Sequence, residues 1–248
     1  YESLDSITSP MAMVAQAQAL PEKFIAPFTL GAPKGTDASQ IVIAAEMNIN
    51  NGLLRIKGKT FSFNSEVNAS LEKANQNYRP IKGKYVMSMP DDAMAGIFMN
   101  VNGTQFLPMM QSNKGIQQLL LGINAAVDMD NIIRSVDGDM TIVMPSFSDS
   151  NLKMTMAAQL AHSKWLADVG YWKESCPKGS SIADWGTYAV KESNHPLPAE
   201  IRKEIVGQKL AMVINLGKSV SSNAAMSAVT SLLTPIFGNL SSVVYTLK

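Results

Sequence analysis

The segment that decides the fold is residues 140–160, MTIVMPSFSDSNLKMTMAAQL. Its second half alternates between two faces, one of which is wholly apolar: Leu152, Met154, Met156, Ala158 and Leu160. A period of two residues is that of a half-buried β-strand. The first half alternates in the same way at Met140, Ile142 and Met144, and polar residues 145–151 have the length of a hairpin connection. We therefore predict two paired antiparallel strands.

The segments around this hairpin predict the fold class. Residues 95–101 alternate like a strand and are followed by a helical pattern, which Pro108 and Gly115 divide into two segments. After residue 161, residues 163–174 have helical spacing and residues 184–192 are strand-like. The order βαββαβ indicates an α+β fold with a ferredoxin-like, split βαβ core, in which two helices pack on one face of an antiparallel sheet.

The remaining segments extend this core at both ends. Residues 11–26 predict an alanine-rich helix broken at Pro21, and residues 41–63 predict a β-hairpin turning at Asn51-Gly52, with a bulge near Gly58. Residues 193–248 repeat the pattern with a helix at 198–206, strands at 210–216 and 238–247, and a helix between them at 220–233. We predict an N-terminal helix and hairpin region at 1–80 and an α+β domain at 81–248. That domain has its core at 84–192 and a βαβ extension at 193–248, and the two regions can pack as one unit.

Composition excludes several function classes. The 21 basic residues nearly balance the 20 acidic ones, so no overall field attracts nucleic acid. The single cysteine, Cys176, excludes an internal disulfide framework and a cysteine-rich metal site. The chain lacks a run of 18 apolar residues and begins at Tyr1 without a signal-like segment. We expect a processed or truncated product, rich in methionine as a flexible core filler.

An aromatic cluster is the main candidate for a binding site. Five aromatic side chains fall within 24 residues: Trp165, Tyr171, Trp172, Trp185 and Tyr188. Such side chains stack on sugar rings or on a partner surface, so we name Trp165, Trp172, Trp185 and Tyr188 as candidate binding residues. The competing interpretation is core packing, because Trp165, Val169 and Trp172 share one helical face, and this spacing is typical of a helix docking on a sheet.

Acidic and basic clusters do not indicate a metal or a nucleic acid. Four aspartates, Asp128, Asp130, Asp137 and Asp139, resemble a calcium loop, but isoleucines replace a ligand and the turn glycine. Helix capping at Asp128 and Asp130 and a turn at Asp137-Gly138 are the preferred explanation. Basic residues 55, 57 and 59 alternate along one strand and favour a solvated face over an anion site. We predict no metal and no cofactor.

Nucleophile patterns are incomplete. S-x-x-K occurs at residues 70–73 and 175–178, but no K-T-G follows and Ser148-Asp149-Ser150 matches S-D-N only in part. The two histidines stand without a G-x-S-x-G motif, and Cys176 with His195 has no supporting context. The sequence favours a protein that is not an enzyme, with a hydrolase of unrecognised site as the second alternative.

Two segments contain no charged side chain, at residues 93–113 and 219–247. Neutral, mildly amphipathic segments of this kind enter bilayers in pore-forming proteins, so a membrane-active, pore-forming-like protein is the first alternative. The competing interpretation is that both segments are buried inside the fold or at an interface.

Four stretches carry a family resemblance: MPDDAMAGIFMNVNGTQFLPMMQSNKGIQQLL at 89–120, SVDGDMTIVMPSF at 135–147, NLKMTMAAQL at 151–160 and HSKWLADVGYW at 162–172. With them, residues 41–248 resemble an uncharacterised family of secreted lipoproteins from gut Bacteroidales. The resemblance implies a bacterial cell envelope location, as an outer-membrane lipoprotein or a secreted protein, with a lipid anchor outside this chain. It implies no established activity and no transferable functional residue.

The function expected from these observations is that of a non-enzymatic cell-envelope or secreted domain. It would act through surface contacts with a protein or glycan partner, because the sequence contains an aromatic cluster but no complete set of catalytic residues.

Overall fold

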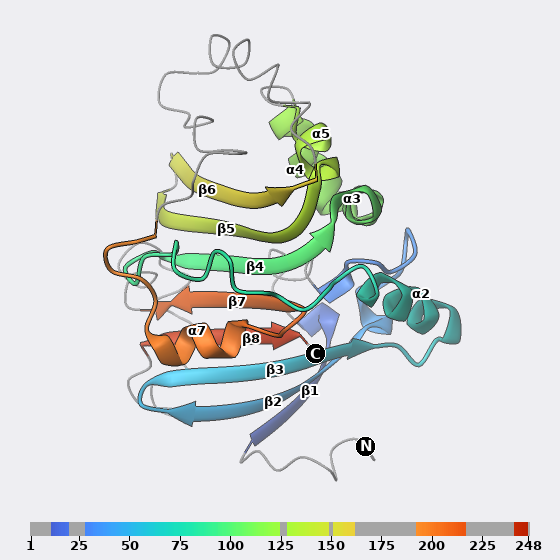
Figure 1. The fold of residues 1–248 in the computed structure, drawn as a ribbon. Coiled ribbons are helices and arrows are strands. Elements are labelled where there is room, and N and C mark those ends of the chain that lie inside the picture. Colours follow the sequence, from blue (N-terminus) through green and yellow to red (C-terminus); the bar gives the residue numbers. More distant parts are fainter. Residues whose placement is uncertain are drawn as a thin grey trace.

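The computed structural model describes residues 11–19, 28–124, 128–148, 151–161, 192–216 and 241–247. The strands in these ranges form one sheet, in the order β1-β2-β3-β8-β7-β4-β5-β6 (Figure 1). Their bounds are β1 Met11–Gln16, β2 Val42–Asn50, β3 Leu53–Phe61, β4 Ala95–Asn102, β5 Val136–Ser148, β6 Asn151–Leu160, β7 Leu210–Asn215 and β8 Ser242–Leu247. β3 and β8 are parallel and the other neighbours are antiparallel, so the sheet of this α+β fold is mixed, and the prediction of a purely antiparallel sheet is wrong.

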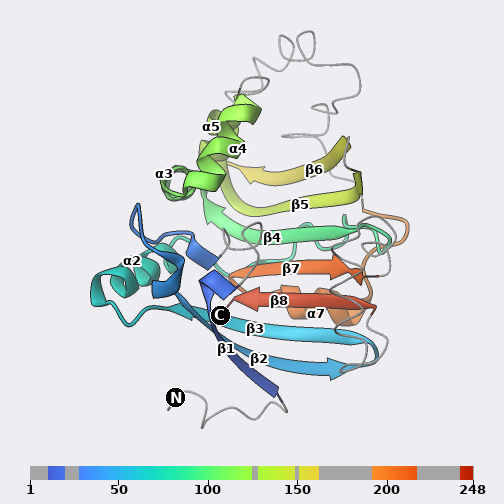
Figure 2. The same ribbon diagram turned by 180° about the vertical axis from the view of Figure 1, so that it is seen from behind.

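Helices lie on both faces of the sheet. The α-helices are α2 Ser65–Asn75, α3 Gly103–Ser112, α4 Lys114–Asn124, α5 Met129–Arg134 and α7 Ala199–Ile205, and short 3-10 helices span Ala17–Ala19 and Ala38–Gln40. In β4, Met99 packs in one core with α3 and α5, while the preceding Phe98 packs in another with α7. Because adjacent strand residues point to opposite faces, the prediction of helices on one face is wrong. Figure 2 shows α7 behind the sheet that it fronts in Figure 1.

The hairpin of β5 and β6 is confirmed. Its strands pair antiparallel, with Met140 opposite Ala158 and Ile142 opposite Met156. The strands run on to Ser148 and Asn151, so the connection is shorter than the predicted polar turn. Pro145 lies inside β5, where the register shifts between Val143 and Ser146. Such an irregularity tolerates a proline, which cannot donate a ladder hydrogen bond.

The split βαβ arrangement is wrong for the described strands. β4 and β5 flank the helices α3 to α5, yet they are direct antiparallel neighbours, with Ile97 opposite Ile142. A split βαβ unit would make them parallel, with another strand between them. β7 and β8 are also antiparallel neighbours, so residues 193–248 do not form a parallel βαβ unit. The predicted helices at 163–174 and 220–233 and the strand at 184–192 lie outside the described residues.

At the N-terminus, one prediction is confirmed and two are wrong. Asn51 and Gly52 both have positive φ angles, +51° and +74°, and join β2 to β3 as a type I′ turn requires. The β2–β3 register runs without interruption, so there is no bulge at Gly58. Residues 11–16 form β1 rather than a helix, because pairing with β2 outweighs the helix propensity of alanine, methionine and glutamine.

The helices after β4 divide near Gly115 as predicted, whereas Pro108 lies inside α3 and does not interrupt it. Asn102 caps α3 by accepting a hydrogen bond at Oδ1 from the Thr104 backbone N–H at 3.1 Å. α3 ends at Ser112 and α4 begins at Lys114, close to the predicted break at Gly115. A Cβ on Gly103 would lie 1.6 Å from the carbonyl oxygen of Ile133, so α3 approaches the end of α5 at a distance that only glycine permits.

Candidate functional site

The predicted binding residues Trp165, Trp172, Trp185 and Tyr188 lie outside the described residues. The same holds for Cys176 and for the second S-x-x-K sequence at 175–178. Their roles therefore stay predictions. The first S-x-x-K sequence, at 70–73, lies in α2, with Ser70 half-buried and Lys73 exposed to solvent.

The four aspartates divide between two places. Asp128 caps α5 by accepting a hydrogen bond from the Asn131 backbone N–H at 3.2 Å, and Asp130 accepts one from Gln111 Nε2 at 2.8 Å. Capping is therefore confirmed at Asp128 and wrong at Asp130, which lies inside α5. Asp137 and Asp139 instead lie in β5, so the predicted turn at Asp137-Gly138 is wrong. Within the ranges that the structure describes, no three metal-binding side chains come together.

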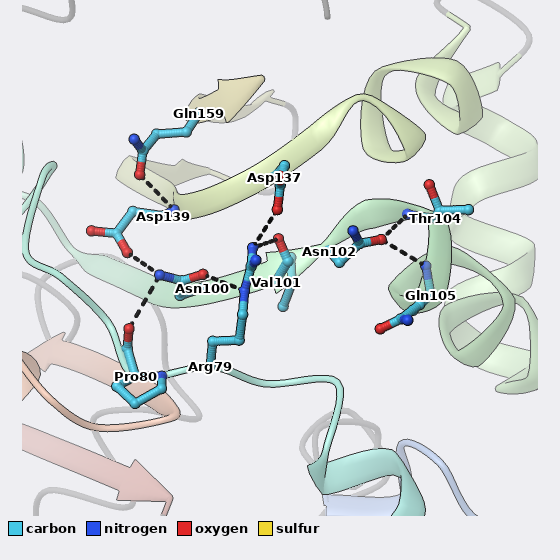
Figure 3. Close-up of polar contacts among 10 residues, drawn as sticks. All are labelled: Arg79, Pro80, Asn100, Val101, Asn102, Thr104, Gln105, Asp137, Asp139 and Gln159. Atoms are coloured by element: carbon cyan, nitrogen blue, oxygen red, sulfur yellow. Dashed lines mark hydrogen bonds and ion pairs between the residues drawn. The ribbon is translucent and has the colours of Figure 1, made fainter. Parts of the chain in front are cut away.

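Asp139 is the centre of a buried polar cluster that the sequence did not predict (Figure 3). Its side chain is 2% exposed and accepts hydrogen bonds from the backbone N–H groups of Lys82, at 3.0 Å, and Lys84, at 2.8 Å. Gly83, between them, has φ +91°, which lets the chain bend so that both donors meet one carboxylate. Residues 82–84 are thereby held against β5.

Asn100 connects this carboxylate to the neighbouring strand. It is 1% exposed and donates from Nδ2 to Asp139 Oδ1 at 2.9 Å and to the Pro80 carbonyl at 3.1 Å. Its own Oδ1 accepts a hydrogen bond from Arg79 Nε at 2.9 Å. All side-chain polar atoms of Asn100 are therefore bonded inside the cluster, as burial of an amide requires.

Arg79 closes the cluster at its solvent side. One terminal nitrogen, Nη2, lies 2.8 Å from Asp137 Oδ1 and donates to the Val101 carbonyl at 2.7 Å. The Arg79 and Asp137 side chains are 44% and 43% exposed, so solvent screens this ion pair. Figure 3 shows the sequence of contacts from Asp137 through Arg79 and Asn100 to Asp139.

The cluster also affects a nearby tyrosine. Burial and, as a smaller contribution, the negative charge of Asp139 together raise the pKa of Tyr85 to about 12. Tyr85 therefore stays neutral at physiological pH. Burial likewise raises the pKa values of Tyr78 and Tyr245.

The chemistry open to this cluster is limited by its own bonding. A general base needs a free lone pair within reach of a substrate proton. Asp139 is buried, and both of its oxygens already accept hydrogen bonds from the chain. The arrangement therefore acts as an anchor, which fixes residues 79–84 across the ends of β4 and β5.

Two of the three basic residues on β3 form ion pairs within the fold. Arg55 lies on β3 beneath α7, with Nε 2.9 Å from Glu204 Oε1 and Nη2 4.0 Å from Glu200 Oε2. Lys57 Nζ lies 3.9 Å from the other oxygen of Glu204. Helix α7 therefore neutralises much of the predicted basic face, and only Lys59 extends to solvent without an acidic neighbour on that helix.

A small cavity lies where residues 28–30, α2 and the ends of β3, β7 and β8 meet. Its lining is mostly apolar and comprises Phe28, Leu30, Thr60, Leu71, Asn75, Tyr78, Leu210, Tyr245 and Leu247. The space inside, about 10 Å³, suits about one water molecule. The buried hydroxyl of Tyr245 has no hydrogen-bond partner in the described part of the chain. This cavity is too small for an organic substrate.

Most of the uncharged segment at 93–113 is buried or half-buried. It forms β4 and α3, and its side chains include Phe98 at 2% exposure, Val101 at 0% and Leu107 at 1%. This placement supports the core interpretation for that segment. No helix in the described ranges has both the length and the apolar character that crossing a membrane takes.

Comparison with known proteins supplies the family. Neither the curated proteins nor the solved structures contain a significant match to this chain. Residues 4–170 match the family model described as Domain of unknown function (DUF4836). That match covers more than half of the 248 residues, so the chain belongs to this family of proteins of unknown function, DUF4836.

Proposed function

We propose that this protein is a non-enzymatic domain of the bacterial cell envelope that acts through surface contacts with a protein or glycan partner. The observation that carries the proposal is the bonding of Asp139, the most buried carboxylate described. Both of its oxygens accept hydrogen bonds from the chain, and the cavity lined by Tyr78 and Tyr245 has room for about one water. Polar groups that are already hydrogen-bonded within the fold are not available to a substrate. We therefore propose recognition at the surface as the mode of action.

The contact surface in this proposal is the aromatic cluster of Trp165, Trp172, Trp185 and Tyr188. Tryptophan and tyrosine carry large rigid apolar areas with one polar group, and this suits both sugar rings and protein hot spots. The partner is therefore a glycan or a protein that presents a flat apolar patch.

The experiment compares binding of the full chain with that of Trp172→Ala and Trp185→Ala on a glycan array and in pull-downs from envelope extracts. The matched control is Phe63→Ala, because Phe63 is an aromatic residue 87% exposed and outside the cluster. We expect at least tenfold weaker binding in the two tryptophan variants and unchanged binding in the control. Binding that survives both tryptophan substitutions, in variants with native circular dichroism, contradicts the proposed surface.

The proposed location is the outer membrane or the medium of a Bacteroidales bacterium, reached as a lipoprotein or as a secreted protein. The resemblance described above supports it, and a lipid anchor would lie outside this chain. Fractionation of cells that express the native protein tests it. Recovery in the cytoplasmic fraction alone would contradict the location without affecting the binding experiment.

A further inference from the structure

β1 is the outermost strand at one end of the sheet. It pairs with β2 on one side, and no strand of the described ranges pairs with its other side (Figure 1). An outermost strand presents a row of unpaired backbone N–H and C=O groups, which is a template for another strand.

The register shows which residues present those groups. Ala17 N–H donates to the Ile41 carbonyl at 2.8 Å, and this pair continues the β1–β2 register. Because alternate residues of an antiparallel ladder bond to the same side, the residues that bond to β2 are Met11, Met13 and Ala15. The backbone groups of Ala12, Val14 and Gln16 therefore point away from the sheet. The same three residues have exposed side chains, and Val14 is 47% exposed.

This edge lacks the features that protect sheet edges in monomeric proteins. The strand, MAMVAQ, contains no charge and no proline, and its register with β2 runs without a bulge. The opposite edge differs. β6 contains Lys153, and its ladder with β5 is interrupted by two register shifts. Only the β1 edge is uncharged and regular.

We infer that β1 pairs with β1 of a second copy of this chain, antiparallel and centred on Val14. A twofold axis perpendicular to the sheet places residues of the same face opposite one another, so Val14 faces its own copy and Ala12 faces Gln16 of the second copy. The pairing forms about six backbone hydrogen bonds. It also brings together two β-branched side chains at the centre, which is favourable between strands.

A second copy fits this edge better than a foreign peptide does. The residues that would face each other are all uncharged, so the edge is complementary to itself. Met11, Met13 and Ala15 share the other face of β1, and the pairing continues their apolar row into the row of the second copy. Because one strand pair buries little area, the dimer is weak and forms at micromolar concentrations or above. This inference is independent of the proposed partner binding.

Charge substitutions at Val14 test the pairing in solution. Val14→Lys places two like charges opposite each other, and Val14→Glu does the same with the opposite sign. By sedimentation velocity over a concentration series, we expect the unsubstituted chain to dimerise and each variant to dissociate at least tenfold more readily. An equimolar mixture of the two variants should dimerise again. An unsubstituted chain that is monomeric at every concentration overturns the inference, and so does a mixture that fails to associate while both variants melt like the parent.

A disulfide cross-link tests the register. In the background Cys176→Ser, Val14→Cys places two thiols across the twofold axis at a Cα separation of about 5.5 Å, within disulfide range. The matched control is Ala12→Cys, which faces Gln16 of the second copy and lies too far from its own equivalent to bond. We expect mild oxidation to give a covalent dimer with Val14→Cys only. Equal cross-linking of both variants, or of neither, overturns the pairing centred on Val14.

Discussion

Two segments attach to the same face of the sheet by different means. Residues 79–84 are held over β4 and β5 by the buried Asp139 and Asn100, while α7 lies over β3, where Arg55 forms ion pairs with it. Asp139 is 2% exposed, whereas the side chains of Arg55 and Glu204 are 19% and 24% exposed. On the sheet-facing side of α7, its own Ile201 and Ile205 are buried in the core. The first attachment adds buried hydrogen bonds to the packing of Ile81, whereas the second depends on apolar packing.

The two attachments differ in whether removing one side chain leaves buried polar groups without a hydrogen-bond partner. Without Asp139, the N–H groups of Lys82 and Lys84 and the amide of Asn100 lose their acceptor in a buried place. A buried donor without a partner costs about 1–3 kcal/mol. Without Arg55, the carboxylate of Glu204 turns to water, and the isoleucines of α7 remain packed on the sheet.

The largest effect is expected for Asp139→Ala. Because three donors lose their acceptor, we expect the free energy of unfolding to fall by about 3 kcal/mol or more. Asp139→Asn should lower the free energy of unfolding by a smaller amount, about 2 kcal/mol. The amide keeps one acceptor oxygen, but it presents an NH₂ group where the second carboxylate oxygen accepted a hydrogen bond. Urea unfolding followed by circular dichroism measures both.

The control for Asp139 is Asp137→Asn, which removes an exposed partner of Arg79. We expect a loss below about 1 kcal/mol, since exposed ion pairs contribute little. Equal losses at Asp137 and Asp139 would show that burial does not determine how much each carboxylate contributes to stability.

The stability of the protein at alkaline pH tests the effect of the buried Asp139 on Tyr85. The unfolded chain releases this proton near its ordinary pKa of 10, whereas burial and Asp139 raise the pKa in the folded protein to about 12. Below pH 10 the stability is therefore unaffected, and as pH rises from 10 to 12 the folded state loses stability. Tyr85→Phe should flatten this part of the stability curve, measured as urea midpoints at successive pH values.

Other tyrosines contribute to the same slope, so the variant is compared with the parent at each pH. The pKa values of Tyr78 and Tyr245 are also raised by burial. A curve that is unchanged by Tyr85→Phe between pH 10 and 12 would contradict the link between Tyr85 and the buried carboxylate.

Tyr245 shows that burial alone does not make an anchor. Its hydroxyl is buried, but it has no partner among the described residues, unlike the carboxylate of Asp139. We expect Tyr245→Phe to leave the free energy of unfolding unchanged or to raise it by up to about 1 kcal/mol, because an unpaired polar atom is removed. A loss of more than 1 kcal/mol would mean that the hydroxyl is bonded, and thermal unfolding distinguishes these outcomes.

Local patterns predicted the hairpins and not the order of the strands. The pairs β2–β3 and β5–β6 follow from alternation and from the turn at Asn51-Gly52, all within a few residues. The parallel pair of β3 and β8 joins Leu53 to Ser242, and no periodicity encodes such a distant partner. β1 was missed because helix formers fill it, and its strand conformation depends on β2.

The buried cluster left a weak signal in the sequence. Asn100 shares a face of its strand with Gly96 and Phe98, and a polar residue at an inward position needs a partner. Nothing local identifies Asp139 as that partner, because the β4–β5 register depends on the intervening helices. The Asp137-Gly138 sequence instead suggested a turn, although Gly138 lies within β5 with φ +143°.

The smallest effect is expected at the ion pair of Arg55 and Glu204. In a double-mutant cycle of Arg55→Met and Glu204→Gln, we expect a coupling free energy below about 1 kcal/mol, because both side chains are partly exposed and solvent screens their charges. Methionine preserves the apolar stem of Arg55 over the sheet, so the cycle isolates the charge. Raising the salt concentration should reduce the coupling further. A coupling free energy as large as the loss at Asp139 would show that α7 is attached mainly by its ion pairs. Both segments would then depend on polar interactions.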